Sequence, residues 1–419
     1  MRILKVVQFY FPFQDRGGPV FKIRALARNL VQRGHQVTIL TADLGVEKHQ
    51  DFDKSYERCE YGWQARNDGV ETIYFSTVAQ YHALTLNPAV IRYARLCLNQ
   101  FDVVHFYGLY DLLGPAVSYF CKRQKIPYVV EPLGMYRPID RSLRIKRLWH
   151  RTLGRNHLNR AARIMATSEL ERREWLEDGI SPEKVIVRYN GIDSETFAAK
   201  PTAGGFRAKW NIPPGEPVVL FLGRLIPRKN ADMLIKAFAE ACPKNGRLVI
   251  AGPDGVPGYL ATLKHLASEC GVESRVIFTG ALYDDAKVAA MTDADIFVLP
   301  SRYENFANAP GEAIACGIPV IVTGTCGISP LIKDRAGLVI IPALNQLINA
   351  LCTLLTDRNL YDRFKRGCQV VASELRWDQL TQQMESCYKQ VMAQEKEIPR
   401  AARAISEPSS DGGYVETRK

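Results

Sequence analysis

Two glutamates at a predicted strand-to-helix junction are the residues of this sequence best placed to do chemistry. Glu304 and Glu312 lie within Leu299–Val320, whose pattern predicts a strand, a loop, a helix, a glycine turn and a second strand. We expect Asn308 to cap the helix and Gly311 to let a ligand approach the backbone, because a helix N-terminus favours an anionic phosphate. The two carboxylates would then contact opposite ends of one elongated ligand. The alternative is a solvated Glu304 and a merely capping Glu312.

A second strand-to-helix junction carries a cluster of cations. Gly223 permits a tight turn after a predicted strand, and Arg224 and Lys229 follow at the carboxyl end of that strand. A diphosphate leaving group gains negative charge as its bond breaks, and fixed positive charge stabilises it. Arg offers a planar fork and Lys a point charge, and Arg228 could replace either. The alternative is an ordinary basic loop on a basic protein.

Two further polar residues are weaker candidates for substrate contacts. His105 is predicted to end a strand, and Asp254 follows another strand and could touch a nucleotide. Two Asp-x-Asp pairs, Asp51 with Asp53 and Asp293 with Asp295, have the spacing of a known metal motif. The first pair lies in a polar loop and the second leads into a strand, so we expect no metal site.

The elements that must position these residues alternate regularly along the chain. Strand-like runs are separated by helix-like segments of 10–15 residues, which predicts βαβ crossovers and parallel sheets. The expected fold is α/β, with two tandem Rossmann-like, doubly wound domains that face each other across a cleft. Ligands bind such sheets at the carboxyl ends of the strands, so chemistry is expected in the loops that follow Leu222, Ala251, Leu299 and Thr323.

Breaker-rich segments divide this alternation into predicted domains. We expect an N-terminal Rossmann-like domain over 1–205 and a C-terminal Rossmann-like domain over 206–376. A helix over 377–396 would pack back on the N-terminal domain. The remaining 397–419 cannot build a core and is expected to be a disordered tail.

Composition narrows the class of protein further. The chain has 419 residues, a net charge of +11 and ten cysteines without a metal-ligand pattern. We expect reduced structural cysteines, no membrane-spanning segment and a cytoplasmic location, since no apolar leader opens the sequence. The charge favours phosphate-bearing ligands or an anionic membrane surface. Nucleic acid is not expected as a partner, because no nucleic-acid-binding signature is present.

Taken in order, these motifs resemble the family 4 retaining glycosyltransferases of the GT-B fold (glycosyl transferases group 1), over roughly residues 1–395. The resemblance implies that Glu304 lies near the donor sugar and that Glu312 holds the ribose hydroxyls. It also implies that Arg224 and Lys229 bind the diphosphate and that Gly18 belongs to an N-terminal glycine loop. The domain over 1–205 would form the acceptor side, and the domain over 206–376 would bind the nucleotide sugar. Three other stretches match familiar parts of the family, namely Gly34–Val37, Asp102–His105 and Asn190–Asp193.

The mechanism that the resemblance implies is retaining transfer without a metal or further cofactor. A nucleotide-diphosphate-sugar would donate the sugar, and an acceptor hydroxyl would attack from the side on which the diphosphate leaves. No residue is assigned as a nucleophile. The protein would contribute positioning, charge stabilisation and closure of its domains around the donor.

The acceptor side departs from the family pattern. Many members carry His or Arg where this chain has Leu133, before Gly134. The following segment, 137–163, holds nine Lys or Arg residues and a single acid, Asp140, in a predicted amphipathic helix. Such a helix can lie on anionic lipid or bind an acceptor phosphate, and the alternative is packing on its own sheet. A lipid-linked or polysaccharide-precursor glycan, at the inner membrane face, is the expected acceptor.

Three other functions share this fold pattern. A nicotinamide-dependent oxidoreductase needs a GxGxxG loop after its first strand, which this chain lacks. A nucleotide-sugar epimerase or a phosphorylase of the same architecture is a closer rival. A non-catalytic relative that only binds a nucleotide sugar is the third, on account of Leu133.

Overall fold

The computed structural model describes residues 1–13, 18–81, 84–136, 148–193, 197 and 203–404. The chain forms two compact units. The first unit comprises Met1–Phe13, Leu30–Ile164 and Gln382–Lys419, and the second comprises Gln14–Asn29 and Met165–Thr381. The expected boundary at residue 205 therefore differs from the observed division, which passes through the strand Arg163–Ala166.

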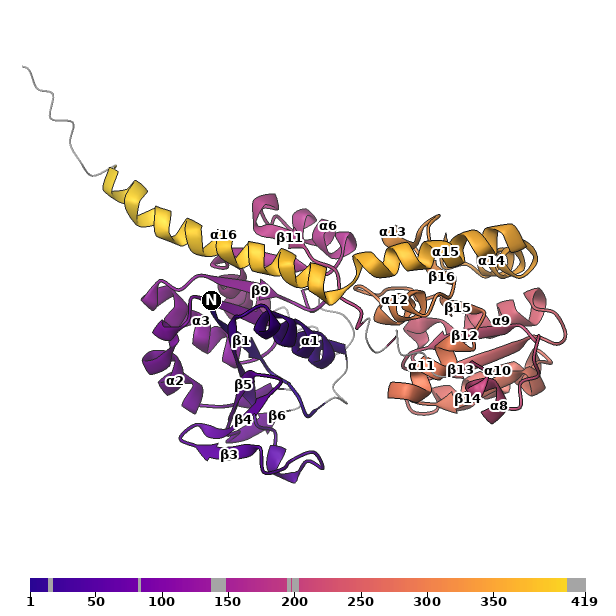
Figure 1. Cartoon of the computed structure of the whole chain (residues 1–419), viewed down its shortest axis with the longest axis horizontal. Helices are drawn as coiled ribbons and strands as arrows, with labels where there is room; N and C mark the ends of the chain where they lie inside the picture. The colour runs from indigo at the N-terminus through magenta and orange to yellow at the C-terminus, as the bar shows by residue number, and fades with distance from the viewer. Residues whose placement is uncertain (14–17, 82–83, 137–147, 194–196, 198–202, 405–419) are drawn as a thin grey trace, which may run out of the picture. The chain divides into compact units, whose positions relative to one another are not determined.

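The first unit contains seven whole strands of a nine-stranded sheet, whose strand β11 (Val185–Val187) belongs to the second unit and whose strand β10 (Arg163–Ala166) is divided between the two (Figure 1). The strands of this sheet, in spatial order, are β11, β10, β9 (Tyr128–Glu131), β8 (Val103–Tyr107), β1 (Arg2–Val7), β2 (Gln36–Ala42), β5 (Val70–Phe75), β4 (Gly62–Asn67) and β3 (Tyr56–Cys59). The pairs from β9 through β5 are parallel, as the alternation predicts, whereas β3 and β4 pair antiparallel. The sequence pattern predicted neither this antiparallel pair nor the small antiparallel pair of β6 (Ala79–Tyr81) and β7 (Leu84–Leu86).

The two faces of this sheet have different partners. Phe106 of β8 packs edge-on against His157 of α5 (Arg155–Asn159), on the face covered by α2 (Ala89–Cys97) and α3 (Leu113–Gln124). Side chains alternate along a strand, so His105 points to the opposite face. There its Nδ1 lies 2.7 Å from the hydroxyl of Tyr388 in α16 (Trp377–Ala404). The predicted packing of the last helix on the N-terminal sheet matches this contact.

A six-stranded, wholly parallel sheet organises the second unit. Its spatial order is β14 (Val276–Gly280), β13 (Arg247–Ala251), β12 (Val218–Leu222), β15 (Ile296–Leu299), β16 (Val320–Thr323) and β17 (Gly337–Ile340). The strand order reverses between β12 and β15, and the carboxyl ends at such a switch point form a ligand-binding crevice. β17 was not expected, because the short run Gly337–Ile340 has no periodicity of its own.

Helices cover this sheet with apolar faces. They are α8 (Gly205–Lys209), α9 (Ala231–Ala241), α10 (Tyr259–Glu269), α11 (Asp284–Thr292), α12 (Asn308–Ala315), α13 (Ser329–Ile332), α14 (Leu344–Thr356) and α15 (Arg358–Glu374). The buried side chains of α9 and of the strands form one hydrophobic cluster. Removing this apolar surface from water stabilises the unit by roughly 25 cal/mol per Å². The strand ends that carry the candidate residues are therefore held on a packed scaffold.

The C-terminal segment departs from the composition-based expectation. α16 extends to Ala404, into the part of the chain expected to be a disordered tail from 397. The remaining 405–419 lie outside the described residues. All ten cysteines are free thiols, and no helix among the described residues is long and apolar enough to cross a membrane.

His157 makes the stability of the fold depend on pH. Burial lowers the pKa of its imidazole to about 4, so the folded protein binds fewer protons than the unfolded chain between that value and about 6.5. The contribution of this buried neutral imidazole to the free energy of unfolding is therefore complete above about pH 6.5. It is lost as the pH falls toward 4, and the loss is on the order of 1–2 kcal/mol at pH 5.

We expect His157→Phe to flatten this dependence, because Phe preserves a ring against Tyr128 and cannot be protonated. Urea unfolding measures the free energy of unfolding of both proteins at pH 7.5, about one unit above the window, and at pH 5, within it. An equal loss of stability in both proteins would show that other groups cause the acid sensitivity.

Candidate functional site

The loop between β15 and α12 fixes the backbone of Glu304. The Glu304 N–H donates to Thr325 O at 3.1 Å, and the Gly327 N–H donates to Glu304 O at 3.0 Å. A further hydroxyl, that of Thr325, donates to Ser301 O at 2.8 Å. The loops after β15 and β16 thus hold each other, and Glu304 starts from a defined position.

The Glu304 carboxylate forms an ion pair with Lys229. The distance from Lys229 Nζ to Glu304 Oε1 is 2.8 Å, and both side chains are 16% exposed. The Ser301 hydroxyl donates to the same oxygen at 3.2 Å. Two groups that are 75 residues apart in the chain therefore meet where β12 and β15 end. Charge-assisted hydrogen bonds of this kind are among the stronger ones.

Lys229 ends a single 3-10 turn, Pro227–Lys229. A Cβ atom at Gly223 would lie 3.1–3.3 Å from the Lys229 side chain, so the glycine leaves the space that the lysine stem occupies. A glycine at position 223 therefore allows the Lys229 side chain to lie close to the backbone of Gly223. The sequence correctly placed Gly223 and Lys229 together at the end of β12.

Glu312 forms a second ion pair, with a residue that the sequence analysis missed. Lys287 Nζ in α11 lies 3.0 Å from Glu312 Oε1, and both side chains are about one-quarter exposed. The same ammonium lies 5.6 Å from the centre of the Phe197 ring, within range of a cation–π interaction. No spacing or motif in the sequence links Lys287 to Glu312.

The start of α12 differs from the expected arrangement at Asn308. The helix is preceded by Ala307 at a φ of 78°, and no side chain caps it. Asn308 is the first helical residue, and its Oδ1 accepts a hydrogen bond from Asn190 Nδ2 at 2.8 Å. The prediction of a capping Asn308 was wrong, because the helix begins one residue earlier than assumed, with Ala307 in the capping position.

Two candidate glycines lie close to this helix start. Gly18 is the first residue of α1 (Gly18–Gln32), and a Cβ there would lie 2.9 Å from Asn308 Nδ2. Gly311 is buried, and a Cβ there would be 3.4 Å from side-chain atoms of Ile192 and Ile328. Gly311 therefore faces apolar packing in the interior rather than open space, contrary to the expectation that it admits a ligand.

Arg224 and Asp254 lie together at the ends of β12 and β13. Both are exposed, and Leu225, next to Arg224, forms an isolated bridge with Asp254. A Cβ at Gly255 would come within 2.4 Å of Arg224 Cγ, so the arginine stem lies over this glycine. Arg224 is left at the surface near the switch point, and its role toward a diphosphate stays a prediction.

His105 does not fit the role of a substrate contact. It is the third residue of the five-residue β8 and is fully buried. Its ring stacks on Tyr107, and the Tyr107 hydroxyl lies 3.0 Å from its Nδ1. The expectation that His105 ends its strand was wrong, because β8 continues for two more residues, and α16 covers that face.

The stretch after β9, where the sequence departs from the family pattern at Leu133, has an unusual backbone conformation. Leu133 has a φ of 57° and Gly134 a φ of 75°, so two consecutive residues after β9 are left-handed. Residues 148–159 of the basic segment are helical and include the π-turn His150–Gly154. The other part of that segment, 137–147, lies outside the described residues. Among those described, no three His, Cys, Asp or Glu side chains form a group suited to a metal ion.

This geometry defines a class of protein. The chain has the GT-B type of fold, with one mostly parallel sheet and one wholly parallel sheet, each covered by helices. Basic and acidic side chains pair at the switch point of the second sheet. Residues 205–369 match the family model for glycosyl transferases group 1, and residues 16–196 match that for glycosyltransferase family 4. The chain belongs to this family of glycosyltransferases, as the motifs of both halves predicted.

Individual relatives are distant. An uncharacterized glycosyltransferase of Methanocaldococcus jannaschii is 24% identical over 353 residues, which cover 79% of this chain and 83% of that protein. A D-inositol 3-phosphate glycosyltransferase of Xylanimonas cellulosilytica is 28% identical, with coverages of 69% and 72%.

Solved structures share the fold at low identity. HepE of Anabaena, in complex with UDP, has a TM-score of 0.74 at 20% identity, covering 93% of this chain and all of that one. WaaG, a glycosyltransferase involved in lipopolysaccharide biosynthesis, has a TM-score of 0.62 at 20% identity, covering 91% and 98%.

The Lys287–Glu312 pair leads to a testable expectation. If Glu312 holds the ribose hydroxyls, Lys287→Met should weaken binding of a nucleoside diphosphate about tenfold, because the carboxylate is no longer held. Binding of the corresponding 2′-deoxy compound should change little. Isothermal titration calorimetry measures both, with Lys365→Met on the exposed face of α15 as the matched control. Equal weakening of both ligands would argue against an orienting role for Lys287.

Proposed function

We propose that the protein is a retaining glycosyltransferase that moves a sugar from a nucleotide-diphosphate-sugar to an acceptor hydroxyl. The observation that carries this proposal is the 2.8 Å pair of Lys229 and Glu304 at the switch point. In this assignment Glu304 contacts the donor sugar and Glu312 the ribose. Arg224 and Lys229 bind the diphosphate, as the family resemblance implies.

Charge at the site accounts for catalysis in this proposal. When the donor enters, its diphosphate competes with Glu304 for the Lys229 ammonium. Lys229 then exchanges the Glu304 carboxylate for the diphosphate as its partner. The two cations then stabilise the charge that develops on the leaving diphosphate. This is the contribution for which other enzymes recruit a divalent ion, and we therefore propose metal-independent transfer without a cofactor.

The donor is proposed to be a nucleoside-diphosphate hexose. Support comes from HepE, which was crystallised with UDP and with UDP-glucose. The acceptor is proposed to be a lipid-linked or polysaccharide-precursor glycan, supported by the involvement of WaaG in lipopolysaccharide biosynthesis. We therefore propose that the reaction takes place on the cytoplasmic side of a membrane.

The basic segment 137–163 is proposed to bind an acceptor phosphate or the anionic membrane surface. In its described part, Leu148 is 64% exposed and Leu153 is 43% exposed. These side chains are therefore not used for packing on the sheet, which supports contact with an apolar or lipidic partner. Leu133 removes the usual His or Arg, so acceptor binding relies on other residues.

A thermal-shift panel tests the donor assignment. One of UDP, GDP, ADP and dTDP is expected to stabilise the wild type by mass action. EDTA should not alter the shift, and Glu312→Gln should reduce it. Stabilisation by a nicotinamide dinucleotide alone would contradict the proposal. Product analysis with the matching labelled donor then separates a transferase from an epimerase, a phosphorylase or a protein that only binds.

Glu304→Gln should separate binding from transfer. We expect turnover to fall about a hundredfold or more, because the charge beside the donor sugar is lost. The nucleoside diphosphate should nevertheless bind several-fold tighter, since Lys229 no longer pairs with a carboxylate. Steady-state kinetics and calorimetry measure the two effects, and Glu273→Gln, exposed in the same unit, is the control. Weaker binding of the diphosphate would contradict the proposed exchange of ion pairs.

A further inference from the structure

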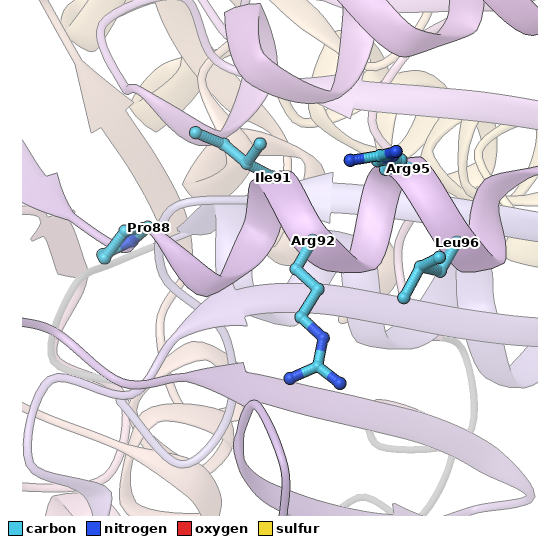
Figure 2. A pocket seen from close by; sticks show the side chains of 5 residues that line it. All are labelled: Pro88, Ile91, Arg92, Arg95 and Leu96. Carbon is cyan, nitrogen blue, oxygen red and sulfur yellow. The ribbon is translucent and has the colours of Figure 1, made fainter.

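α2 and α3 present large apolar side chains to solvent. Val90, Tyr93 and Ala94 of α2 are buried, whereas Ile91 is 52% exposed and Leu96 is 56% exposed. Figure 2 shows both side chains projecting from the helix. On α3, Tyr119 is 51% exposed. A helix that serves only to cover its sheet needs one apolar face, and α2 has apolar residues on its outer face as well.

The same outer surface is positively charged. Neither helix contains an acidic residue, while Arg92 and Arg95 lie on α2 and Lys122 and Arg123 on α3, followed by Lys125. Arg92 pairs with Glu60 at 3.0 Å. Within the described part of the chain, the other four cations form no ion pair with a carboxylate. Their charge is therefore available to an external anionic partner.

The two helices form one continuous surface. Gln124 Nε2 of α3 donates to Ala94 O of α2 at 3.1 Å, which fixes the helices side by side on the same face of the sheet. The outer side of α2 is hollowed by a shallow cavity of about 490 Å³, lined by Pro88, Ile91, Arg92, Arg95 and Leu96. We call the exposed residues of both helices, Ile91, Arg92, Arg95, Leu96, Tyr119, Lys122 and Arg123, the α2–α3 face.

We propose that the α2–α3 face docks on the surface of an anionic lipid bilayer. Exposed apolar and aromatic side chains among cations, most of them without an ion-pair partner in the described part of the chain, suit the boundary between headgroups and acyl chains. There the apolar groups leave water and the cations meet anionic headgroups. A nucleic acid would use the cations but leaves Ile91 and Leu96 without a partner. A second copy of the chain would bring the same cations together, which is unfavourable.

This surface is separate from the donor site. It lies in the first unit, whereas Lys229, Glu304, Lys287 and Glu312 all belong to the second. It also goes beyond the proposed role of the basic segment 137–163, because it assigns membrane contact to different helices. Docking would hold the first unit at the place where a lipid-linked acceptor is found, and it does not depend on which donor the enzyme uses.

Vesicle sedimentation with the full chain tests the proposal. The wild type should bind vesicles that contain phosphatidylglycerol and ignore vesicles of phosphatidylcholine alone. Binding should weaken with added salt, because salt screens exposed charges. Ile91→Asp with Leu96→Asp, and separately Lys122→Glu with Arg123→Glu, should each lower binding about tenfold or more. The matched controls lie on α15. They are Val370→Asp, at a side chain that is 54% exposed, and Lys365→Glu with Arg366→Glu.

Two further readouts keep these outcomes distinct. The thermal shift with a nucleoside diphosphate shows that a variant is folded, and it tests the donor site independently of the vesicles. Unchanged vesicle binding in the folded face variants would overturn the proposal, as would wild-type binding that ignores lipid charge. Light scattering that shows a wild-type dimer, converted to a monomer by Ile91→Asp with Leu96→Asp, would instead identify the face as a contact between copies.

Discussion

The adjacency of β12 and β15 is the constraint on which the functional part of this molecule depends. These strands are separated by 73 residues between the end of one and the start of the other, yet they pair directly in the sheet. Parallel strands place their carboxyl ends at one edge, so the loops that follow each strand meet there. Lys229 and Glu304 reach each other for this reason alone. Any change that altered the strand order would separate the two charges without touching either residue.

The pairing of both glutamates with lysines also has an electrostatic meaning. A carboxylate near an incoming diphosphate repels it, and two such carboxylates would exclude it. Lys229 and Lys287 each neutralise one of them, so the site can hold its carboxylates ready without opposing the ligand. Arg224, exposed at the end of β12, adds positive charge beyond this balance. Under the proposed function, the paired arrangement therefore reconciles two acids that contact the donor with the negative charge of its diphosphate.

Much of this could be predicted from the sequence, and the failures have physical causes. The spacing of apolar residues and the positions of Gly and Pro located the parallel strands, because buried strands in such sheets are continuous apolar runs. They missed β3, β4 and β17, which are short or lie near an edge. Residue types and spacing singled out Glu304, Glu312, Arg224 and Lys229, and the structure places Lys229 against Glu304. They could not find Lys287, since tertiary packing alone brings α11 to α12. They misplaced His105 and Asn308 because burial and the first residue of a helix depend on contacts that a linear pattern does not contain.

The helix α16 has a consequence for the order in which the chain can fold. His105 and Tyr388 bond at the centre of the first unit although 283 residues separate them. A ribosome adds roughly 5–20 residues per second, and domains generally form as they emerge. Here the first unit stays incomplete until its covering helix has been synthesised, and that helix follows the whole of the second unit along the chain. During translation the face of β8 that carries His105 therefore lacks its final cover, while the second unit can already close.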